Sequence, residues 1–280
     1  MKVSEGDYIA FCDVDDWYQP NGIGAMVDKA LANKAPIVKA GYQKVLSPTS
    51  IIKATKRFVD EDSVLRRNDW GAEEYLRFYN PHHHSFASGM WGSLYDRRKV
   101  IANIPNSIAE NGLCRGEDLL FNAYAMDSAE LVMTIPDVVY NYRLGGITST
   151  NVRLIDDLFS YKDMIDSFLA VKAPVPKPLL DVEFAAYTLS ILLKRYQNNA
   201  RSPIGDLRGF YAQCVADNRV RLLAELVVSQ GFERDETVVE VAQSIIHGDE
   251  EEMLSIACKR DHFQRLIFRG ACAIADRSRG

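Results

Sequence analysis

The sequence lacks the features that mark several well-known protein classes. Its five cysteines, Cys12, Cys114, Cys214, Cys258 and Cys272, include no CxxC pair and no zinc-binding spacing. An odd and dispersed set of this kind argues for reduced thiols and against a disulfide framework. No apolar run reaches the ~18–20 residues that span a bilayer, and no signal peptide is visible. We therefore expect a cytoplasmic protein.

A strong excess of charge of either sign is also absent. The 280 residues carry a formal net charge of -5, and 47% of them are hydrophobic. This balance gives no reason to expect nucleic acid as a partner, although a local phosphate site is compatible with it. The length suffices for one large domain or two small ones.

The chain changes character near residue 150. Strand-like and helix-like segments alternate before that point, and amphipathic helical patterns fill nearly all of the sequence after it. We predict an α/β domain over residues 1–152 and a helical C-terminal domain over residues 153–280. The segment "VKAPVPKP", residues 171–178, is the predicted linker, since its prolines exclude a helix in its middle.

Local patterns predict individual elements in the first part. We expect a buried strand at 7–13, because a short apolar run follows Gly6. A helix is expected to begin after Pro20, and Asp69 is the predicted N-cap of another. A further helix should begin near Gly116, and residues 131–143 should form a strand pair or a bent strand broken by Pro136. The remaining expected elements are strands at 36–46 and 50–59, an extended segment at 86–96 and a short helix at 97–104.

Three carboxylates follow the first predicted strand within four positions. In "YIAFCDVDD" they are Asp13, Asp15 and Asp16. Open α/β sheets place ligands at the carboxyl ends of their strands, and crowded carboxylates repel one another unless a cation neutralises them. Mg²⁺ and Mn²⁺ prefer oxygen ligands and commonly bind through one or two carboxylates together with substrate phosphates. The alternative is a solvated turn, which aspartates also favour.

Four segments, in order over residues 6–150, resemble family 2 glycosyltransferases of the GT-A type. "GDYIAFCDVDDWYQP" is similar to the DxD segment of that family, and "GSLYDRRKVI" to its strand-to-helix segment. "GEDLLFNAYAM" resembles the Gly-Glu-Asp helix start, and "VVYNYRLGGITST" the tyrosine-rich strand ending in Tyr-Arg. The resemblance implies a partial GT-A-like mixed sheet followed by an all-α region.

The resemblance also implies roles for individual residues. Asp15 would coordinate a divalent cation, Mn²⁺ or Mg²⁺, that bridges the diphosphate of a nucleotide-sugar. Asp13 would contact the donor nucleotide or the metal shell, and the adjacent Asp16 would support either role. Asp118 would be the general base for the acceptor hydroxyl, with Glu117 beside it. Arg143 would lie near the diphosphate.

The implied activity is metal-dependent, inverting transfer of a sugar, of the hexosyltransferase type. The donor would be a nucleotide-sugar and the acceptor a saccharide or lipid-linked saccharide, in surface or capsular polysaccharide synthesis. For Glu117 and Asp118 the alternative is favourable negative charge at a helix N-terminus, worth about 0.3–1 kcal/mol.

The chain departs from the family pattern at its start. The βα units that build the nucleotide-binding half in the family do not precede Gly6, since Met1 lies only five residues before it. An incomplete sheet exposes unpaired edges. We therefore expect an internal start, a shortened chain, or a second copy or partner chain that completes the sheet.

Two other functions remain open from the sequence. "FCDVDD" also resembles the nucleophile strand of haloacid dehalogenase-type phosphatases, although Trp17 stands where that family expects Thr or Val. The other alternative is a non-catalytic protein whose helical region binds a partner.

Three further features have a structural and a functional reading. His82, His83 and His84 form either a polar loop or part of a metal shell. Trp17 and Trp91 suit either packing or sugar stacking, and we favour packing for Trp91. The basic segment 258–280 suits either a packed terminal helix or weak, peripheral contact with the inner face of the membrane.

Overall fold

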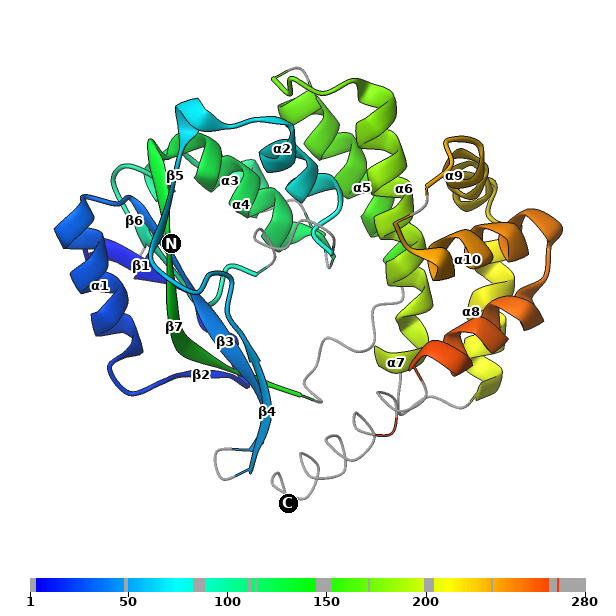
Figure 1. Ribbon diagram of the computed structural model, residues 1–280, viewed down its shortest axis with the longest axis horizontal. Helices are drawn as coiled ribbons and strands as arrows, with labels where there is room; N and C mark the ends of the chain where they lie inside the picture. The colour runs from blue at the N-terminus through cyan, green and yellow to red at the C-terminus, as the bar shows by residue number, and fades with distance from the viewer. Residues whose placement is uncertain are drawn as a thin grey trace.

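The structure is a computed structural model, and it places a sheet beside a bundle of helices (Figure 1). It describes residues 4–47, 50–82, 89–109, 112–113, 115–144, 153–170, 172–198, 204–232, 234–261 and 266. His83, His84, Cys114, Cys272 and most of the basic segment 258–280 lie outside the described residues. The same holds for residues 86–88 of the predicted extended segment.

The described strands form one mixed sheet in the order β1-β6-β3-β7-β2. The central strand β3, Ile37–Ser47, runs parallel to β7, Leu131–Arg143, and antiparallel to β6, Ser93–Asp96. Strand β1, Tyr8–Ala10, pairs with β6, and β2, Trp17–Tyr18, pairs with β7. Two further strands are attached to this path: β4, Ser50–Lys56, pairs with β3, and β5, Ser63–Arg66, pairs with β7.

Strand β7 is continuous through Pro136, so the predicted strand pair is wrong. Its pairing with β3 shifts register between Thr134 and Val138. Proline has no N–H for the ladder and is tolerated at an irregularity of this kind. The strand therefore keeps its length while its register adjusts at the proline.

The two faces of the sheet are covered by different elements. Helix α1, Gly22–Asn33, packs Met26 and Ala30 against one face, together with Val38 of β3. Ile37 belongs to the opposite face, which packs against α2, Ala72–Tyr79, and α4, Glu117–Ser128. Side chains alternate along a strand, so Lys39 shares the face of Ile37 and is buried on the α4 side.

Helix α2 begins two residues later than predicted. Asp69 lies in a 3-10 turn, Arg67–Asp69, and Gly71 is the N-cap residue. The Glu74 carboxylate accepts the main-chain N–H of Gly71 at 2.9 Å and so satisfies a donor at the helix start. The predicted short helix at 97–104 reduces to a 3-10 turn, Ile101–Asn103, beside the short α3, Asn106–Ala109.

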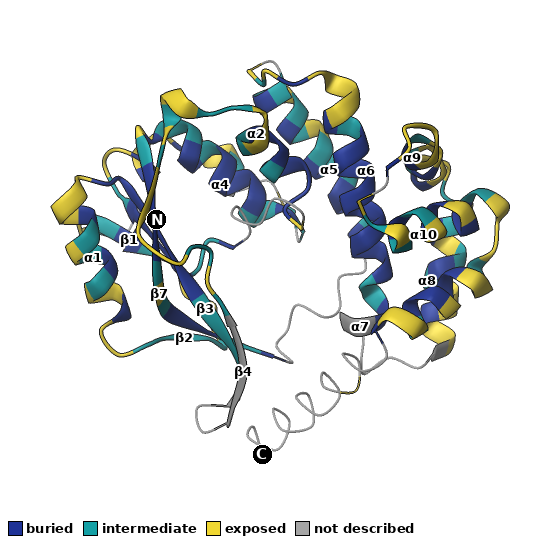
Figure 2. Cartoon of the chain, viewed as in Figure 1, coloured by how far each residue is buried: buried dark blue, intermediate teal, exposed yellow. Residues whose placement is uncertain are grey.

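The described elements after residue 153 are all helical. They are α5, Leu154–Ile165; a π-helical turn, Asp166–Ala170; α6, Lys177–Leu193; α7, Arg195–Asn198; α8, Ile204–Ala216; α9, Asn218–Ser229; and α10, Glu236–His247. A last helical stretch covers residues 250–261. Figure 2 shows α6 buried along most of its length, so this helix forms the axis of the region.

The predicted fold class, a partial GT-A-like α/β sheet followed by an all-α region, is confirmed. One hydrophobic cluster extends from Ile9 on β1 through α4 and α6 to Ala257. The sheet and the helices therefore share a core. Within the described residues, no helix has the length and apolar character needed to cross a membrane.

Candidate active site

Aromatic packing brings the two predicted groups of acids to the same place. Phe11, just before the first group, packs edge-on against Phe121, which lies one turn after Glu117 on α4; their ring centroids are 5.3 Å apart. Tyr95 of β6 contacts both rings, at 5.8 and 5.4 Å. Edge-to-face pairs of this kind fix relative orientation as well as burying surface. The end of β1 is therefore held against the first turn of α4.

Helix α4 is anchored by a buried polar network. The Tyr95 hydroxyl donates to Asn122 Oδ1 at 2.7 Å, and Asn122 Nδ2 donates to the main-chain oxygen of Gly89 at 3.0 Å. The N-cap residue Gly116 has φ +91°, which favours glycine, and a Cβ there would lie 2.9 Å from Cγ of Tyr161 on α5. The helical region thus contributes to the position of the residues that follow Gly116.

Asp118 carries the most distinctive acid–base environment among the predicted residues. Its pKa is raised to about 7, first by burial and then by the charges of Glu117 and Asp13, against the opposing effects of a Met90 main-chain hydrogen bond and the charge of Lys39. Burial also raises the pKa of Glu117. A carboxyl group with a pKa near neutrality is suited to accept a proton at physiological pH.

Lys39 is a site residue that the sequence analysis missed. Its side chain is fully buried, and burial lowers its pKa to about 8 although Asp118 acts in the opposite direction. The available signal was a lysine within the β-branched run "PIVKAGYQKVL". A cation at a buried position of a central strand indicates a charged partner nearby.

Asp13 lies in the loop after β1 and faces the start of α4. Its main-chain N–H donates to the hydroxyl of Tyr140 at 3.0 Å. Partial burial raises its pKa, and so does the charge of Asp15. Asp13 in turn acts on both Glu117 and Asp118, so the structure brings these three carboxylates within electrostatic range of one another.

Asp16 turns inward and holds the acidic loop to β7. Its Oδ1 accepts the main-chain N–H of Arg143 at 2.7 Å, whereas its Oδ2 is buried and has no hydrogen-bond partner among the described residues. Burial raises the pKa of Asp16 to about 6, although the Arg143 N–H and the Tyr140 hydroxyl lower it. Arg143 makes this contact with Asp16 through its main chain.

Tyr140 organises this loop and was not singled out as a site residue. Its hydroxyl accepts from Asp13 and lies beside Asp16. Its ring stacks on Trp91 at 5.1 Å and meets Tyr18 edge-on at 5.0 Å. The tyrosine-rich segment "VVYNYR" was the signal for it. Trp91 therefore makes the packing contact expected of it.

His82 contacts the helical region. Its Nδ1 lies 3.2 Å from the Ser190 hydroxyl, its Nε2 lies 3.0 Å from Lys194 Nζ, and its ring packs edge-on against Tyr187. All three partners lie in the C-terminal half of α6 or directly after it. His82 thus packs between the α2 side of the molecule and α6.

The residues that could hold a metal ion are carboxylates from one loop. Within the described part of the chain, no three His, Cys, Asp or Glu side chains are grouped as a metal site. The chemistry of the donor set fits Mg²⁺ or Mn²⁺ through one or two carboxylates of the acidic loop, because carboxylate oxygens are the ligands these cations prefer.

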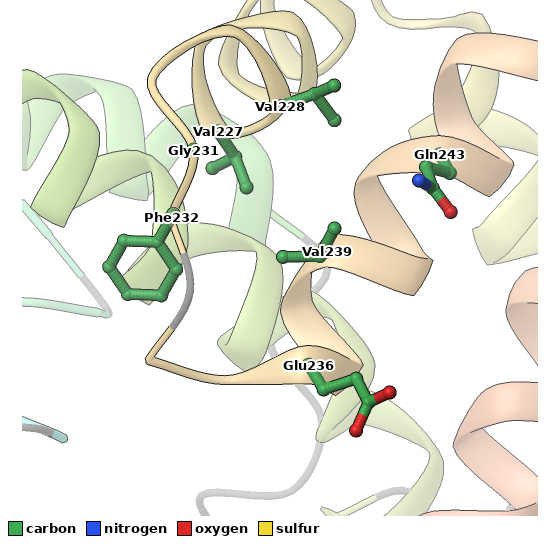
Figure 3. A pocket seen from close by; sticks show the side chains of 7 residues that line it. All are labelled: Val227, Val228, Gly231, Phe232, Glu236, Val239 and Gln243. Atoms are coloured by element: carbon green, nitrogen blue, oxygen red, sulfur yellow. The ribbon is translucent and has the colours of Figure 1, made fainter.

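A separate groove of about 510 Å³ lies in the helical region (Figure 3). Val227, Val228, Phe232 and Val239 give it an apolar lining between α9 and α10, and Glu236 and Gln243 stand along α10. None of its lining residues belongs to the acidic loop or to α4, so it is distinct from the carboxylate site.

Structural comparison shows which known fold the chain is similar to. The fold is similar to that of residues 1–349 of S. aureus TarS, a GT-A glycosyltransferase solved in complex with UDP-GlcNAc. Sequence identity is 12%, the TM-score is 0.50, and the match covers 94% of this chain and 69% of that one. A second structure, with UDP, gives 11% identity, a TM-score of 0.47 and coverage of 94% and 68%. The first likeness shows the fold.

The sequence comparison concerns the first part of the chain. Residues 1–100 match the family model of glycosyl transferase family 2, which confirms the resemblance drawn from the sequence over this part of the chain. This match and the fold both agree with the predicted glycosyltransferase class. The match includes the DxDD segment and favours the glycosyltransferase interpretation of that segment over the phosphatase alternative. No curated protein matches the sequence.

Proposed function

We propose that this protein transfers a sugar from a nucleotide-sugar to a saccharide acceptor, with inversion at the anomeric carbon and with Mn²⁺ or Mg²⁺ as cofactor. The observation that carries the proposal is the position of Asp118, whose pKa is raised to about 7, opposite Asp13 of the acidic loop. One side chain is ready to accept a proton, and the facing loop offers oxygens for a cation that accompanies a diphosphate.

Asp118 acts as the general base in this scheme. It takes the proton of an acceptor hydroxyl as that oxygen attacks C1 of the donor sugar. The bond between C1 and the diphosphate oxygen breaks, and its electron pair leaves with the nucleoside diphosphate. A single displacement of this kind inverts the anomeric centre. Glu117 supports the base, because its negative charge helps to raise the pKa of Asp118.

The acidic loop is the proposed metal and donor site. Asp15 and Asp13 would hold the divalent cation, and Asp16 would hold the loop in place through its contact with the Arg143 main chain. When bound, the cation would take up negative charge on the leaving diphosphate. The Arg143 side chain remains our candidate for contact with the same diphosphate.

The donor and the cellular role extend this proposal. UDP-GlcNAc is the first donor to test, because a protein of similar fold binds it. We keep the expectation of a saccharide or lipid-linked saccharide acceptor in surface polysaccharide synthesis, with the protein cytoplasmic or at the inner face of the membrane. We also propose that a second copy of the chain or a partner chain lies beside β1. The chain is further proposed to divide into an α/β domain, residues 1–152, and a helical domain, residues 153–280.

The test measures UDP binding and turnover on the purified chain. Calorimetry with UDP should show tighter binding with Mn²⁺ than with EDTA, and UDP-GlcNAc should release UDP slowly even without an acceptor. Asp118→Asn should leave UDP binding within about twofold and lower UDP release by about 10²-fold or more. Asp28→Asn, an exposed change on α1, is the matched control.

Two results would overturn the proposal. Absence of UDP binding with and without Mn²⁺ would remove the donor, and unchanged UDP release in Asp118→Asn would remove the base. The non-catalytic alternative predicts that Asp15→Asn and Asp118→Asn both leave the biological role intact.

A further inference from the structure

Three side-chain amides, those of Asn141, Gln19 and Gln43, form a row that we call the amide row. Asn141 lies on β7 at its centre and is 2% exposed. Its Oδ1 accepts from Nε2 of Gln19 at 2.8 Å and from Nε2 of Gln43 at 2.7 Å. Its Nδ2 donates to the main-chain oxygen of Trp17 at 3.3 Å. One buried amide therefore joins β7 to β3 on one side and to the segment around β2 on the other.

The Trp17 oxygen fixes the direction of these hydrogen bonds. A main-chain carbonyl oxygen can only accept, so the edge of the Asn141 amide that faces it must be the NH₂ group. Oδ1 then points to the other side, where the two glutamine donors use both of its lone pairs. The amide row fits together in one arrangement, which requires Trp17 to lie opposite Asn141, as it does in the β2–β7 pairing.

Strand β2 depends on such contacts because it is very short. It consists of Trp17 and Tyr18, so its ladder with β7 has two residue pairs. So short a ladder specifies its register weakly, and a slip by one residue would move each side chain to the other face of the sheet. The amide row adds side-chain hydrogen bonds that a slipped register would break.

The amide of Asn141 is an unusual choice for its place in a strand. Strand interiors favour β-branched and aromatic side chains, and Asn141 stands between Tyr140 and Tyr142. A buried amide is costly unless it is hydrogen-bonded, and apolar groups of the same shape in place of both partners can be nearly neutral for stability. The hydrogen bonds of Asn141 therefore serve the position of the chain more than its stability.

The amide row holds one end of the acidic loop, and other groups of β7 hold the remainder. Asp13 donates its main-chain N–H to the Tyr140 hydroxyl at 3.0 Å, and Asp16 accepts the N–H of Arg143 at 2.7 Å. Trp17, which the amide row holds, follows directly in the chain. The carboxylates of the loop are therefore presented from a segment that is fixed at both ends.

We propose that Asn141 is a positioning residue of the acidic loop. Through Trp17 it fixes where Asp13 and Asp15 present their carboxylates, and it thereby sets the affinity of the loop for a divalent cation. Carboxylates bind a small cation well where their oxygens are held in the geometry that the cation requires. The effect on the cation rests on the proposed function, whereas the effect on the position of the loop does not.

Hydrogen exchange measures the order of the loop without any ligand. Asn141→Leu removes all three hydrogen bonds and fills the same space, so amide exchange over residues 11–19 should become about tenfold faster or more. Gln43→Met removes one of these hydrogen bonds at similar length and should act in the same direction. Asn80→Leu is the matched control, because it removes a similarly buried amide that donates to Glu183 of α6, and it should leave exchange over residues 11–19 unchanged.

Calorimetric titration of Mn²⁺ in the presence of UDP measures the consequence for the cation. Asn141→Leu should weaken Mn²⁺ binding by about tenfold or more, because the carboxylates lose their fixed geometry, and UDP binding in EDTA should stay within about twofold. Asn80→Leu should leave Mn²⁺ binding unchanged. Urea unfolding of both variants compares their losses of stability, so that an effect of lower stability alone is recognised.

Three results would overturn the proposal. They are unchanged exchange over residues 11–19 in both Asn141→Leu and Gln43→Met, normal Mn²⁺ binding in a variant whose loop exchanges faster, and an equal loss of Mn²⁺ binding in Asn80→Leu. A wild-type chain that binds neither UDP nor Mn²⁺ would instead remove the proposed function. Faster exchange in Asn141→Leu would then still support the positional role of Asn141.

Discussion

Lys39 and Asp118 lie within electrostatic reach of each other, although one belongs to the central strand β3 and the other to the first turn of α4. The buried ammonium stabilises the ionised carboxylate, while burial and the charges of Glu117 and Asp13 oppose ionisation. The balance sets the pKa of Asp118 at about 7. Several of the predictions below depend on this balance.

The pH dependence of turnover should report Asp118. UDP release should rise with pH as this group loses its proton, with an apparent pKa of about 7. Lys39→Met removes the favourable cation at similar volume, so the limb of the profile should move to higher pH. Lys99→Met, an exposed change after β6, should leave the profile unchanged. An unshifted profile in Lys39→Met would exclude the coupling.

Stability should depend on pH through the same group. Because the folded pKa of Asp118 is raised, the unfolded chain binds fewer protons at this group between about pH 4 and 7, and the contribution to stability is lost as pH rises through 7. Asp118→Asn should therefore raise Tm more at pH 8 than at pH 5, because only part of this loss has developed at pH 5. Calorimetric scans at the two pH values measure this, with Asp28→Asn as control. An equal effect at both would contradict the assignment.

Substitutions of Asp15 and Asp16 should have different effects, because we propose that Asp15 binds the cation and that Asp16 holds the acidic loop in position. Asp15→Asn should lower the Mn²⁺-dependent part of UDP affinity and leave the free energy of unfolding within about 0.5 kcal/mol. Asp16→Ala removes the acceptor of the Arg143 N–H and should cost about 1–3 kcal/mol in urea unfolding at neutral pH. If Asp15→Asn keeps the full Mn²⁺ effect, Asp15 is not a metal ligand.

Gly116→Ala should destabilise the protein through two effects. The residue has φ +91°, and the new Cβ would lie 2.9 Å from Cγ of Tyr161. We expect a loss of about 2–4 kcal/mol, of which about 1–2 kcal/mol comes from the backbone alone. Gly112→Ala is the matched control, because Gly112 has φ +71° and no atom within 4 Å of the added Cβ. Equal losses in the two variants would show that contact with Tyr161 carries no cost.

The elements that the sequence predicted well carry a local signal. Helix α1 follows Pro20 with apolar residues at helical spacing, and β3 is rich in β-branched residues. Strands β2 and β5 were missed because each is short and exists through pairing with β7. We predicted Asp69 as the N-cap of α2 because aspartate is a common N-cap residue. In the structure Gly71 is the N-cap, and the Glu74 carboxylate accepts its main-chain N–H.

The sequence alone predicted which acidic residues form the candidate site, but it did not predict the contacts between them. The acids at 13–16 and 117–118 stand out in the sequence, but the pairing of Asp16 with the Arg143 main chain joins positions 127 apart. The depth of Lys39 and the approach of His82 to α6 likewise depend on packing between distant elements. Local patterns identify candidate groups, and tertiary structure decides which of them meet.

The Glu183 carboxylate on α6 links this helix to the segment just before α10, and so limits which helices can be exchanged. It is 1% exposed, accepts from Asn80 at 2.8 Å, and pairs with Arg234, which lies just before α10, at 2.6 Å. Arg234 is half exposed, but removing it would still be unfavourable, because the buried Glu183 carboxylate keeps its desolvation penalty and loses this cation. Chimeras that exchange the last helices for those of another protein would therefore have to supply a cation at the place of Arg234. The sequence of the terminal helices is thus constrained by their contact with the buried Glu183 carboxylate, in addition to any function of their outer surfaces.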